Sequence, residues 1–279
     1  MPVSNDFSPF GQYQPRGLVA RVIGITRHRA VSWLGRRFGF WCRAAGIALL
    51  RGEPQDVESL GARMRLYPSH NVSEKNLLFT PHLFDPEERQ ELGKRIRDGF
   101  TFIDIGANVG GYSLFAAALA GPHARILAIE PHPGIFERLS YNVRQNPFGS
   151  IKALECAVTD QDGTITLFVD PSNSGESSMR FVNSHGKAHA VKVPAKALRT
   201  ILTEEGFDTL DALKVDVEGA EDLILEPFFR DVEPRLWPKL LIVDSSTSRA
   251  TSSIPVSGTG SAYKLVLRTR SNSVYERLV

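Results

Sequence analysis

The chain has 279 residues, enough for one large α/β domain with an extension, and its hydrophobic fraction of 42% permits a sizeable core. The formal net charge is only +2, so no global field points to a nucleic-acid partner. The two cysteines, Cys42 and Cys156, lie far apart and match no metal or redox spacing, so we expect no metal site. This cysteine usage, and an N-terminus without the basic-then-apolar order of a secretion signal, favour a reducing cytoplasm.

Residues 1–56 are expected to form a basic, partly helical extension ahead of a main domain at residues 57–279. Met1 to Arg16 is polar, contains three prolines and is predicted to be disordered. Gly17 to Arg51 holds seven arginines and no acid, and is predicted to form one or two helices. Such a helix either lies on an anionic membrane surface or packs its apolar face on the main domain or a second subunit. We favour packing, because the apolar positions do not fall on one clean face.

The main domain is expected to begin with a small hairpin at Val57 to Tyr67, where apolar and polar residues alternate loosely. Pro86 to Arg97 is predicted to be a charged helix with Asp85 as its N-cap. The next segment, Phe100 to Ala116, has the pattern of a buried strand, a glycine turn and a helix. That order is typical of a phosphate or nucleotide site in an open α/β sheet.

The residues around this turn indicate which nucleotide it binds. A dinucleotide site needs a second glycine for close approach of the pyrophosphate, but Asn108 stands between Gly106 and Gly110. Asp104, at the end of the strand, would also repel a pyrophosphate. Glu130 ends the next apolar strand, 20 residues past Gly110, where an acid can accept both ribose hydroxyls. S-adenosylmethionine has no phosphate and carries a sulfonium and an ammonium, so we favour it over a nicotinamide cofactor.

The rest of the chain repeats the order strand, loop, helix, which predicts a mostly parallel sheet with right-handed crossovers. The further strands of this sheet are expected at Arg125 to Glu130, Ile151 to Val158, Leu210 to Asp216, Lys239 to Asp244, Tyr263 to Arg268 and Val274 to Leu278. Ligands of such sheets bind beyond the carboxyl ends of the strands. Four of the expected strands end there in an acid, at Asp104, Glu130, Asp216 and Asp244.

Four motifs of this sequence resemble those of the FkbM-type S-adenosylmethionine-dependent methyltransferases. They are FIDIGANVGGYSL (Phe102 to Leu114), AIEPHP (Ala128 to Pro133), AVTDQDG (Ala157 to Gly163) and LKVDVEGAE (Leu213 to Glu221). The resemblance implies a class I methyltransferase fold, with a seven-stranded, mostly parallel sheet whose last strand is antiparallel. It also implies O-methylation of a hydroxyl on a sugar, a glycolipid or a polyketide-like metabolite.

The same resemblance implies roles for individual residues. The methionine part of the cofactor would be held by Asp104, Gly106, Asn108 and Gly110, the ribose by Glu130, and the adenine by the turn at Cys156 and Ala157. The chain departs from the family in two places. Asp244 stands where the family usually has Glu, and the segment after it is short and rich in serine, so the helix expected there is truncated.

An alcohol attacks a methyl group better when a base takes its proton, and we assign this role to Asp216 or Glu218. His185 and His189 are rival bases, although exposed loop positions explain both histidines more simply. Thr164 to Val169 should pair with Ala190 to Pro194 as an antiparallel flap, and the polar loop between them would cover a sugar-like acceptor or serve as a linker. A non-catalytic binding module and an NAD-dependent oxidoreductase remain alternative functions of the same fold.

Overall fold

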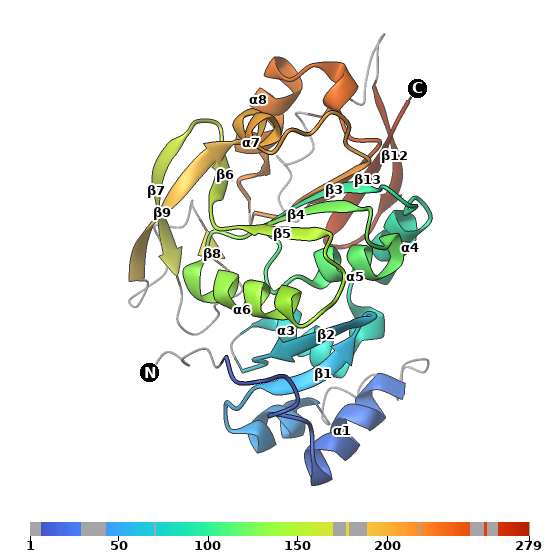
Figure 1. Ribbon diagram of the computed structural model, residues 1–279, viewed down its shortest axis with the longest axis vertical. Coiled ribbons are helices and arrows are strands. Elements are labelled where there is room, and N and C mark those ends of the chain that lie inside the picture. The colour runs from blue at the N-terminus through green and yellow to red at the C-terminus, as the bar shows by residue number, and fades with distance from the viewer. Residues whose placement is uncertain are drawn as a thin grey trace.

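The computed structural model describes residues 7–28, 43–69, 71–169, 177–178, 189–217, 219–245, 254–255 and 262–278. A seven-stranded sheet in the order β12-β13-β11-β10-β3-β4-β5 forms the centre of the protein (Figure 1). Its strands are β3 (Thr101–Ile105), β4 (Arg125–Ile129), β5 (Ile151–Leu154), β10 (Ala212–Val215), β11 (Leu240–Asp244), β12 (Tyr263–Arg268) and β13 (Asn272–Arg277).

Five neighbouring strands of this sheet, from β11 to β5, are parallel, and β13 pairs antiparallel with both β11 and β12. The central strands β3, β10 and β11 are almost fully buried, as expected for a parallel sheet with both faces covered. The mostly parallel sheet with its last strand antiparallel is therefore confirmed.

Helices cover both faces of the sheet. One face carries α4 (Pro86–Gly93), α5 (Gly111–Ala120) and α6 (Pro133–Arg144), and the other carries α7 (Leu198–Glu204) and α8 (Glu221–Asp231), as Figure 1 shows. The helix expected to reach Arg97 ends at Gly93 instead. Arg95 and Ile96 already make tighter, i to i+3 backbone hydrogen bonds, to Leu92 and Gly93.

The expected flap is a second, four-stranded sheet in the order β6-β9-β7-β8. Its strands are β6 (Ala157–Thr159), β7 (Gly163–Val169), β8 (Ser177–Ser178) and β9 (His189–Ala197). The antiparallel pairing of β7 with β9 is confirmed, with Thr164 opposite Pro194 and Phe168 opposite Ala190. The prediction of one strand from Ile151 to Val158 was wrong, because the chain leaves the main sheet after Leu154 and pairs with β9 from Ala157.

An N-terminal unit packs beneath α5 and α6 (Figure 1). It consists of α1 (Gly17–His28), a helical stretch at residues 43–50, β1 (Gln55–Ser59), β2 (Ala62–Leu66), α3 (Val72–Phe79) and a 3₁₀ turn (Pro81–Leu83). Val22 and Ile23 of α1 share a buried apolar cluster with Leu77 of α3 and with Val109 and Leu114 of the main domain. Packing on the main domain is therefore confirmed for α1, and the hairpin is confirmed as β1 and β2.

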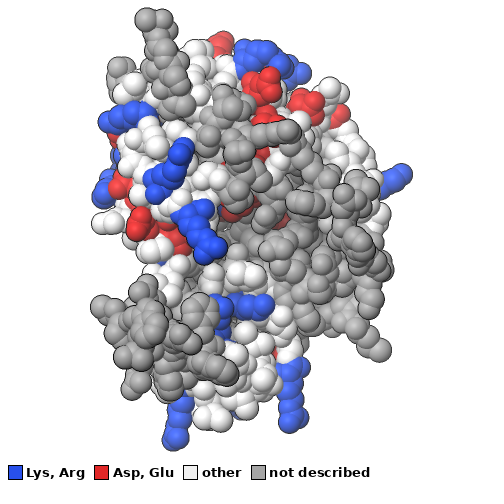
Figure 2. Space-filling view, turned by 180° about the vertical axis from the view of Figure 1, so that it is seen from behind, with Lys and Arg blue, Asp and Glu red and all other residues white. Residues whose placement is uncertain are grey.

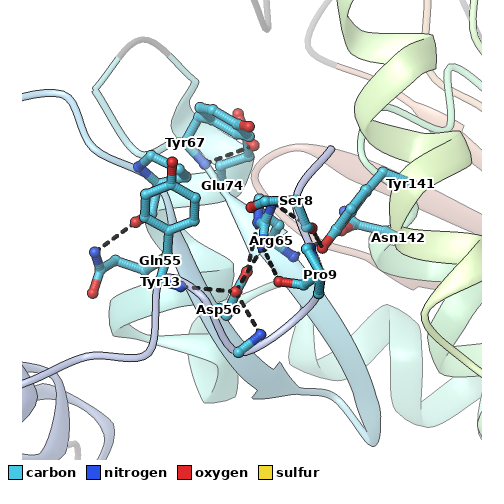
Figure 3. A network of polar contacts seen from close by, with 12 residues as sticks. Ser8, Pro9, Tyr13, Gln55, Asp56, Arg65, Tyr67, Glu74, Tyr141 and Asn142 are labelled. Carbon is cyan, nitrogen blue, oxygen red and sulfur yellow. Dashed lines mark hydrogen bonds and ion pairs between the residues drawn. The ribbon is translucent and has the colours of Figure 1, made fainter. Parts of the chain in front are cut away.

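The prediction of disorder for Met1 to Arg16 was wrong for residues 7–16, which follow an ordered path over the hairpin; residues 1–6 lie outside the described part. The reason is a polar network that composition does not reveal (Figure 3). Asp56 accepts hydrogen bonds from the backbone N–H groups of Gly11 and Tyr13, at 2.8 and 3.1 Å. Two backbone donors of the segment therefore find a fixed partner on β1.

Arg65 of β2 holds the same segment from the other side. Its guanidinium is buried, forms a two-pronged ion pair with Asp56 at 2.7 and 2.8 Å, and donates to the carbonyls of Ser8 and Pro9 at 3.0 Å each. It also stacks on the ring of Tyr141 in α6, 4.6 Å from the ring centroid. Arg65 thus ties the N-terminal segment to the hairpin and to the main domain.

Candidate active site

The carboxyl ends of β4, β3 and β10 lie side by side and form the floor of a pocket. The strand register places Lys214 of β10 beside Asp104 of β3, and Asp104 beside Ala128 of β4. Asp104, Glu130 and Asp216 line the same pocket, as the sequence predicts for acids at the ends of adjacent strands.

The glycine turn after β3 depends on the absence of side chains at two positions. Gly106 has a φ of +76°, and a Cβ there would lie 1.9 Å from the carbonyl oxygen of Asp216. Gly110 has a φ of +94°, and a Cβ there would lie 2.9 Å from Cδ1 of Leu139 in α6. Gly106 lines the pocket, whereas Gly110 faces α6 and serves the packing of the turn.

The Glu130 carboxylate organises the turn from the end of β4. Its Oε2 accepts the backbone N–H of Asn108 and its Oε1 that of His132, both at 2.9 Å. Burial raises the pKa of Glu130 to about 7, although these two N–H groups favour the charged form. Each oxygen keeps a second lone pair, so the carboxylate can still accept ribose hydroxyls.

Asp104 presents an unsatisfied acceptor to the pocket. Its Oδ2 accepts the hydroxyl of Ser113 at 2.6 Å, while its Oδ1 is buried without a hydrogen-bond partner and lies 3.9 Å from Nζ of Lys214. Burial raises the pKa of Asp104, and the Lys214 ammonium opposes this shift. A buried acceptor of this kind suits a cationic donor from a ligand.

Lys214 is a buried cation that the sequence reading did not single out. Its side chain is 4% exposed, and its Nζ donates to Oδ2 of Asp216 at 2.8 Å and lies 5.0 Å from the ring centroid of Tyr112. Burial alone would lower the pKa of this amine, but Asp216 and Asp104 raise it above its ordinary value, so Lys214 stays charged. The sequence offered only one signal, a lysine inside an otherwise apolar strand.

Asp85 also lies in the pocket, and the helix-capping role expected for it was only half right. It precedes α4, with Pro86 at the first helical position, but its side chain makes no cap hydrogen bond. Its carboxylate lines the pocket and accepts the hydroxyl of Tyr112 at 3.1 Å. A φ of +39° is unusual for a residue other than glycine, and burial raises the pKa of Asp85.

The side of the pocket near β6 is apolar. Ala157 and Cys156 line it together with Ile129, Val158 and Leu167. Burial raises the pKa of the Cys156 thiol to about 11, so this cysteine is chemically inert here. Side chains of this kind suit the faces of a flat aromatic ring such as adenine.

A comparison with models of known protein families identifies the family to which the chain belongs. The model described as the methyltransferase FkbM domain matches residues 104–250, which is just over half of the sequence. The chain belongs to the FkbM methyltransferase family. Its seven-stranded sheet, with β13 antiparallel, is the class I methyltransferase arrangement that the resemblance implies.

Three relatives illustrate the similarity to this family. Methyltransferase sdnD of Sordaria araneosa is 34% identical over 152 residues, covering 44% of this chain and 58% of that protein. The 31-O-demethyl-FK506 methyltransferase FkbM of Streptomyces tacrolimicus is 27% identical over 176 residues, or 53% of this chain and 65% of that protein. The hexuronic acid methyltransferase AglP of Haloferax volcanii is 27% identical over 128 residues, which cover 44% of this chain and 47% of that protein. The matches therefore span about half to two thirds of these relatives.

The cofactor of this FkbM-family protein is S-adenosylmethionine, and the described side chains fit it. Among the described residues that line the pocket, four carry carboxyl groups (Asp85, Asp104, Glu130 and Asp216) and Lys214 carries the one ammonium. This excess of acids suits a sulfonium and an ammonium and would repel the pyrophosphate of a nicotinamide cofactor. The part of the chain that the structure describes holds no cluster of His, Cys, Asp or Glu suited to a metal ion.

Several other residues named from the sequence lie outside the pocket or outside the described chain. Glu221, the first residue of α8, accepts the N–H groups of Gly219 and Val217, at 3.0 and 3.2 Å, and so stabilises the start of that helix. Asp244 ends β11 as expected and is buried, but it does not line the pocket. Glu218, His185 and the side chain of His189 fall outside the described residues.

Proposed function

We propose that this chain transfers a methyl group from S-adenosylmethionine to a hydroxyl oxygen of a sugar, glycolipid or polyketide-like acceptor. The observation that carries the proposal is the unequal charge of the pocket, which holds four carboxyl groups and one ammonium among its described lining residues. Three of these carboxyl groups, from Asp104, Glu130 and Asp216, lie at the carboxyl ends of adjacent strands, and the fourth, from Asp85, lies just before α4. Transfer to oxygen is supported by the relatives whose names contain a 31-O-demethyl substrate and a hexuronic acid.

The proposed roles follow from the positions of the side chains. When bound, S-adenosylmethionine supplies an electrophilic methyl group, so holding the acceptor in line provides much of the rate. Glu130 accepts the ribose hydroxyls, and the free Oδ1 of Asp104 accepts the ammonium of the methionine part. The turn at Gly106 and Asn108 surrounds that part, Gly110 supports the turn through its packing against α6, and Ala157 contacts the adenine.

Asp216 is our candidate for the group that takes the acceptor proton. Its side chain is 37% exposed, so an acceptor can reach it, and Lys214 fixes the orientation of its carboxylate through the 2.8 Å ion pair. Asp85 lines the same pocket and can orient a second hydroxyl of a sugar-like acceptor. Glu218 remains the alternative base that the sequence suggests.

The experiment that tests this function is incubation of the protein with labelled S-adenosylmethionine and a panel of bacterial glycans, glycolipids and polyketides. Mass analysis should find one added methyl group on a hydroxyl oxygen of an acceptor. Calorimetric titration separates the alternatives. Binding of NAD in place of S-adenosylmethionine would indicate an oxidoreductase, and binding of neither would leave a non-catalytic module.

A further inference from the structure

Asn71 lies outside the matched family segment, yet it contacts the cofactor turn directly. It is fully buried and caps the first turn of α3, where its Oδ1 accepts the backbone N–H of Glu74 at 3.1 Å. Its Nδ2 donates to Oδ1 of Asn108 at 2.9 Å. Because the helix uses the oxygen of Asn71, only its nitrogen is available to Asn108, and the contact has a fixed polarity.

This polarity determines which end of the Asn108 amide meets the pocket. The Oδ1 of Asn108 already accepts from Asn71 and from the N–H of Val109, which lies 2.9 Å away. The backbone of Asn108 is held in the left-handed region at φ +51° by the 2.9 Å hydrogen bond from its N–H to Glu130. Asn108 lines the pocket, and its Nδ2 has no partner among the described residues, so two free N–H donors remain on that side.

Donors are scarce among the described side chains of this pocket. Four of its side chains are carboxylic acids, and its one ammonium, on Lys214, is already paired with Asp216. The cofactor that we assign carries an α-carboxylate, which needs donors to offset its desolvation. The amide nitrogen of Asn108 can supply one of them.

We propose that Asn71 is a positioning residue, which turns the Asn108 amide so that its Nδ2 donates to the α-carboxylate of the cofactor. The path runs from the Glu74 N–H to Asn71, from Asn71 to Asn108, and from Asn108 into the pocket. This inference rests on the proposed use of S-adenosylmethionine. It assigns a positioning role to a residue that lies outside the segment matched by the family model, residues 104–250.

Two substitutions separate this role from helix capping. Asp and Ser are both good N-cap residues, so Asn71→Asp and Asn71→Ser should both keep the start of α3. Asn71→Ser should leave the melting temperature nearly unchanged, whereas Asn71→Asp places a carboxyl group at a buried position and should lower it. Neither can donate to Asn108 as the amide nitrogen does. In Asn71→Asp, the new carboxylate can accept a hydrogen bond from Nδ2 of Asn108, which favours turning this nitrogen away from the pocket. Asn71→Ser removes the amide donor without adding a charge.

The measurement is calorimetric titration with two probes. S-adenosylhomocysteine carries the α-carboxylate, and 5′-methylthioadenosine has the same adenosine and thioether but no amino-acid part. We expect both variants to bind S-adenosylhomocysteine about tenfold more weakly, as for one lost hydrogen bond to a charged group, and to bind 5′-methylthioadenosine as the wild type does. In an Asn108→Ala background, Asn71→Ser should add no further loss.

Unchanged affinity for S-adenosylhomocysteine in both variants would overturn the inference while leaving the proposed function intact. Equal losses for the two probes would also overturn it, because they would indicate a general distortion of the turn. A wild-type protein that binds neither probe would contradict the proposed function itself.

Discussion

Lys214 places a charge where the protein otherwise buries apolar strand residues. Its ammonium stays inside because the carboxylates of Asp216 and Asp104 surround it, at 2.8 and 3.9 Å. The ion pair between Lys214 and Asp216 restricts the rotation of the Asp216 side chain and directs one of its carboxylate oxygens toward β10. The other oxygen is then available to an acceptor, which is the arrangement that a proton-accepting carboxylate needs.

Asp216→Asn tests the assignment of Asp216 as the group that takes the acceptor proton. The amide keeps the shape of the side chain but cannot take a proton, so we expect turnover to fall about 10² to 10⁴-fold. The affinity for S-adenosylmethionine, measured by calorimetry, should change much less than turnover. Glu226→Gln, at an exposed position of α8, is the matched control and should leave both quantities unchanged. Wild-type turnover in Asp216→Asn would remove Asp216 from the chemistry.

We expect Glu130 to make cofactor binding sensitive to pH. Burial raises its pKa to about 7 in the free protein, and its charged form suits both the ribose hydroxyls and a cationic ligand. Protonation should therefore weaken binding, and affinity for S-adenosylmethionine should rise with pH through about 7, by up to about tenfold per unit below the pKa. Calorimetry from pH 5.5 to about 8.5 checks this. In Glu130→Gln the rise should be smaller than in the wild type, and an identical profile would rule out Glu130 as its cause.

The N-terminal segment is an element whose order depends on one buried ion pair. Asp56 and Arg65 are almost fully buried, so each charge depends on the other and on the backbone groups of residues 8–13. Removing one member leaves the other charge buried without compensation. The hairpin, and not the composition of the segment, therefore decides whether this stretch is ordered.

Asp56→Ala should lower the free energy of unfolding by about 3–5 kcal/mol, as for other buried pairs broken on one side. Chemical denaturation measures this, and proteolysis should cleave the segment ahead of α1 faster than in the wild type. Glu233→Ala removes an exposed partner of Arg235 and should cost about 0.5 kcal/mol or less. Equal effects of the two substitutions would contradict the role assigned to the Arg65 network.

On the scale of the whole molecule, the N-terminal unit and the main domain share one core. The expected boundary between residues 56 and 57 falls inside β1, and the apolar cluster around Leu77 extends to Val109 and Leu114 of the main domain. We propose that the two parts fold as one unit, with the N-terminal unit forming one wall of the cofactor site.

The surface of the N-terminal unit carries features that relate to the hypothesis of contact with an anionic membrane. Figure 2 shows acidic side chains mainly in the upper half of one face, while Lys and Arg dominate the lower end, where the N-terminal elements lie. Leu18 and Ile25 of α1 are exposed beside Arg21. No helix in the described ranges of the chain is long and apolar enough to cross a bilayer.

Vesicle sedimentation tests this contact. If the basic face meets lipid, the protein should sediment with vesicles containing phosphatidylglycerol and not with vesicles of phosphatidylcholine alone, and added salt should release it. Arg21→Gln should weaken the interaction, whereas Lys152→Gln, at an exposed position on β5, should not. Sedimentation with neither kind of vesicle would rule out membrane contact, and equal sedimentation with both would contradict a role for the basic face.

The local pattern of the sequence was sufficient to predict the sheet, the glycine turn and the acids at the ends of its strands. Thr101 to Ile105 and Gly106 specify their conformations through neighbours in the chain. Lys214, Asp85 and Asn71 were missed because their roles come from residues far away in sequence. Nothing near Asn71 indicates Asn108, 37 positions later. The split after Leu154 was missed for the same reason, because the partner strand, β9, comes much later in the chain.

We propose that the methyl donor lies across the ends of β4, β3 and β10, and a crystal structure with S-adenosylhomocysteine tests this directly. We predict ribose hydroxyls at Glu130, the amino group at Asp104, the carboxylate at the Asn108 amide and the adenine beside Ala157. A ligand bound elsewhere, or bound here with no contact to Glu130 and Asp104, would contradict the account.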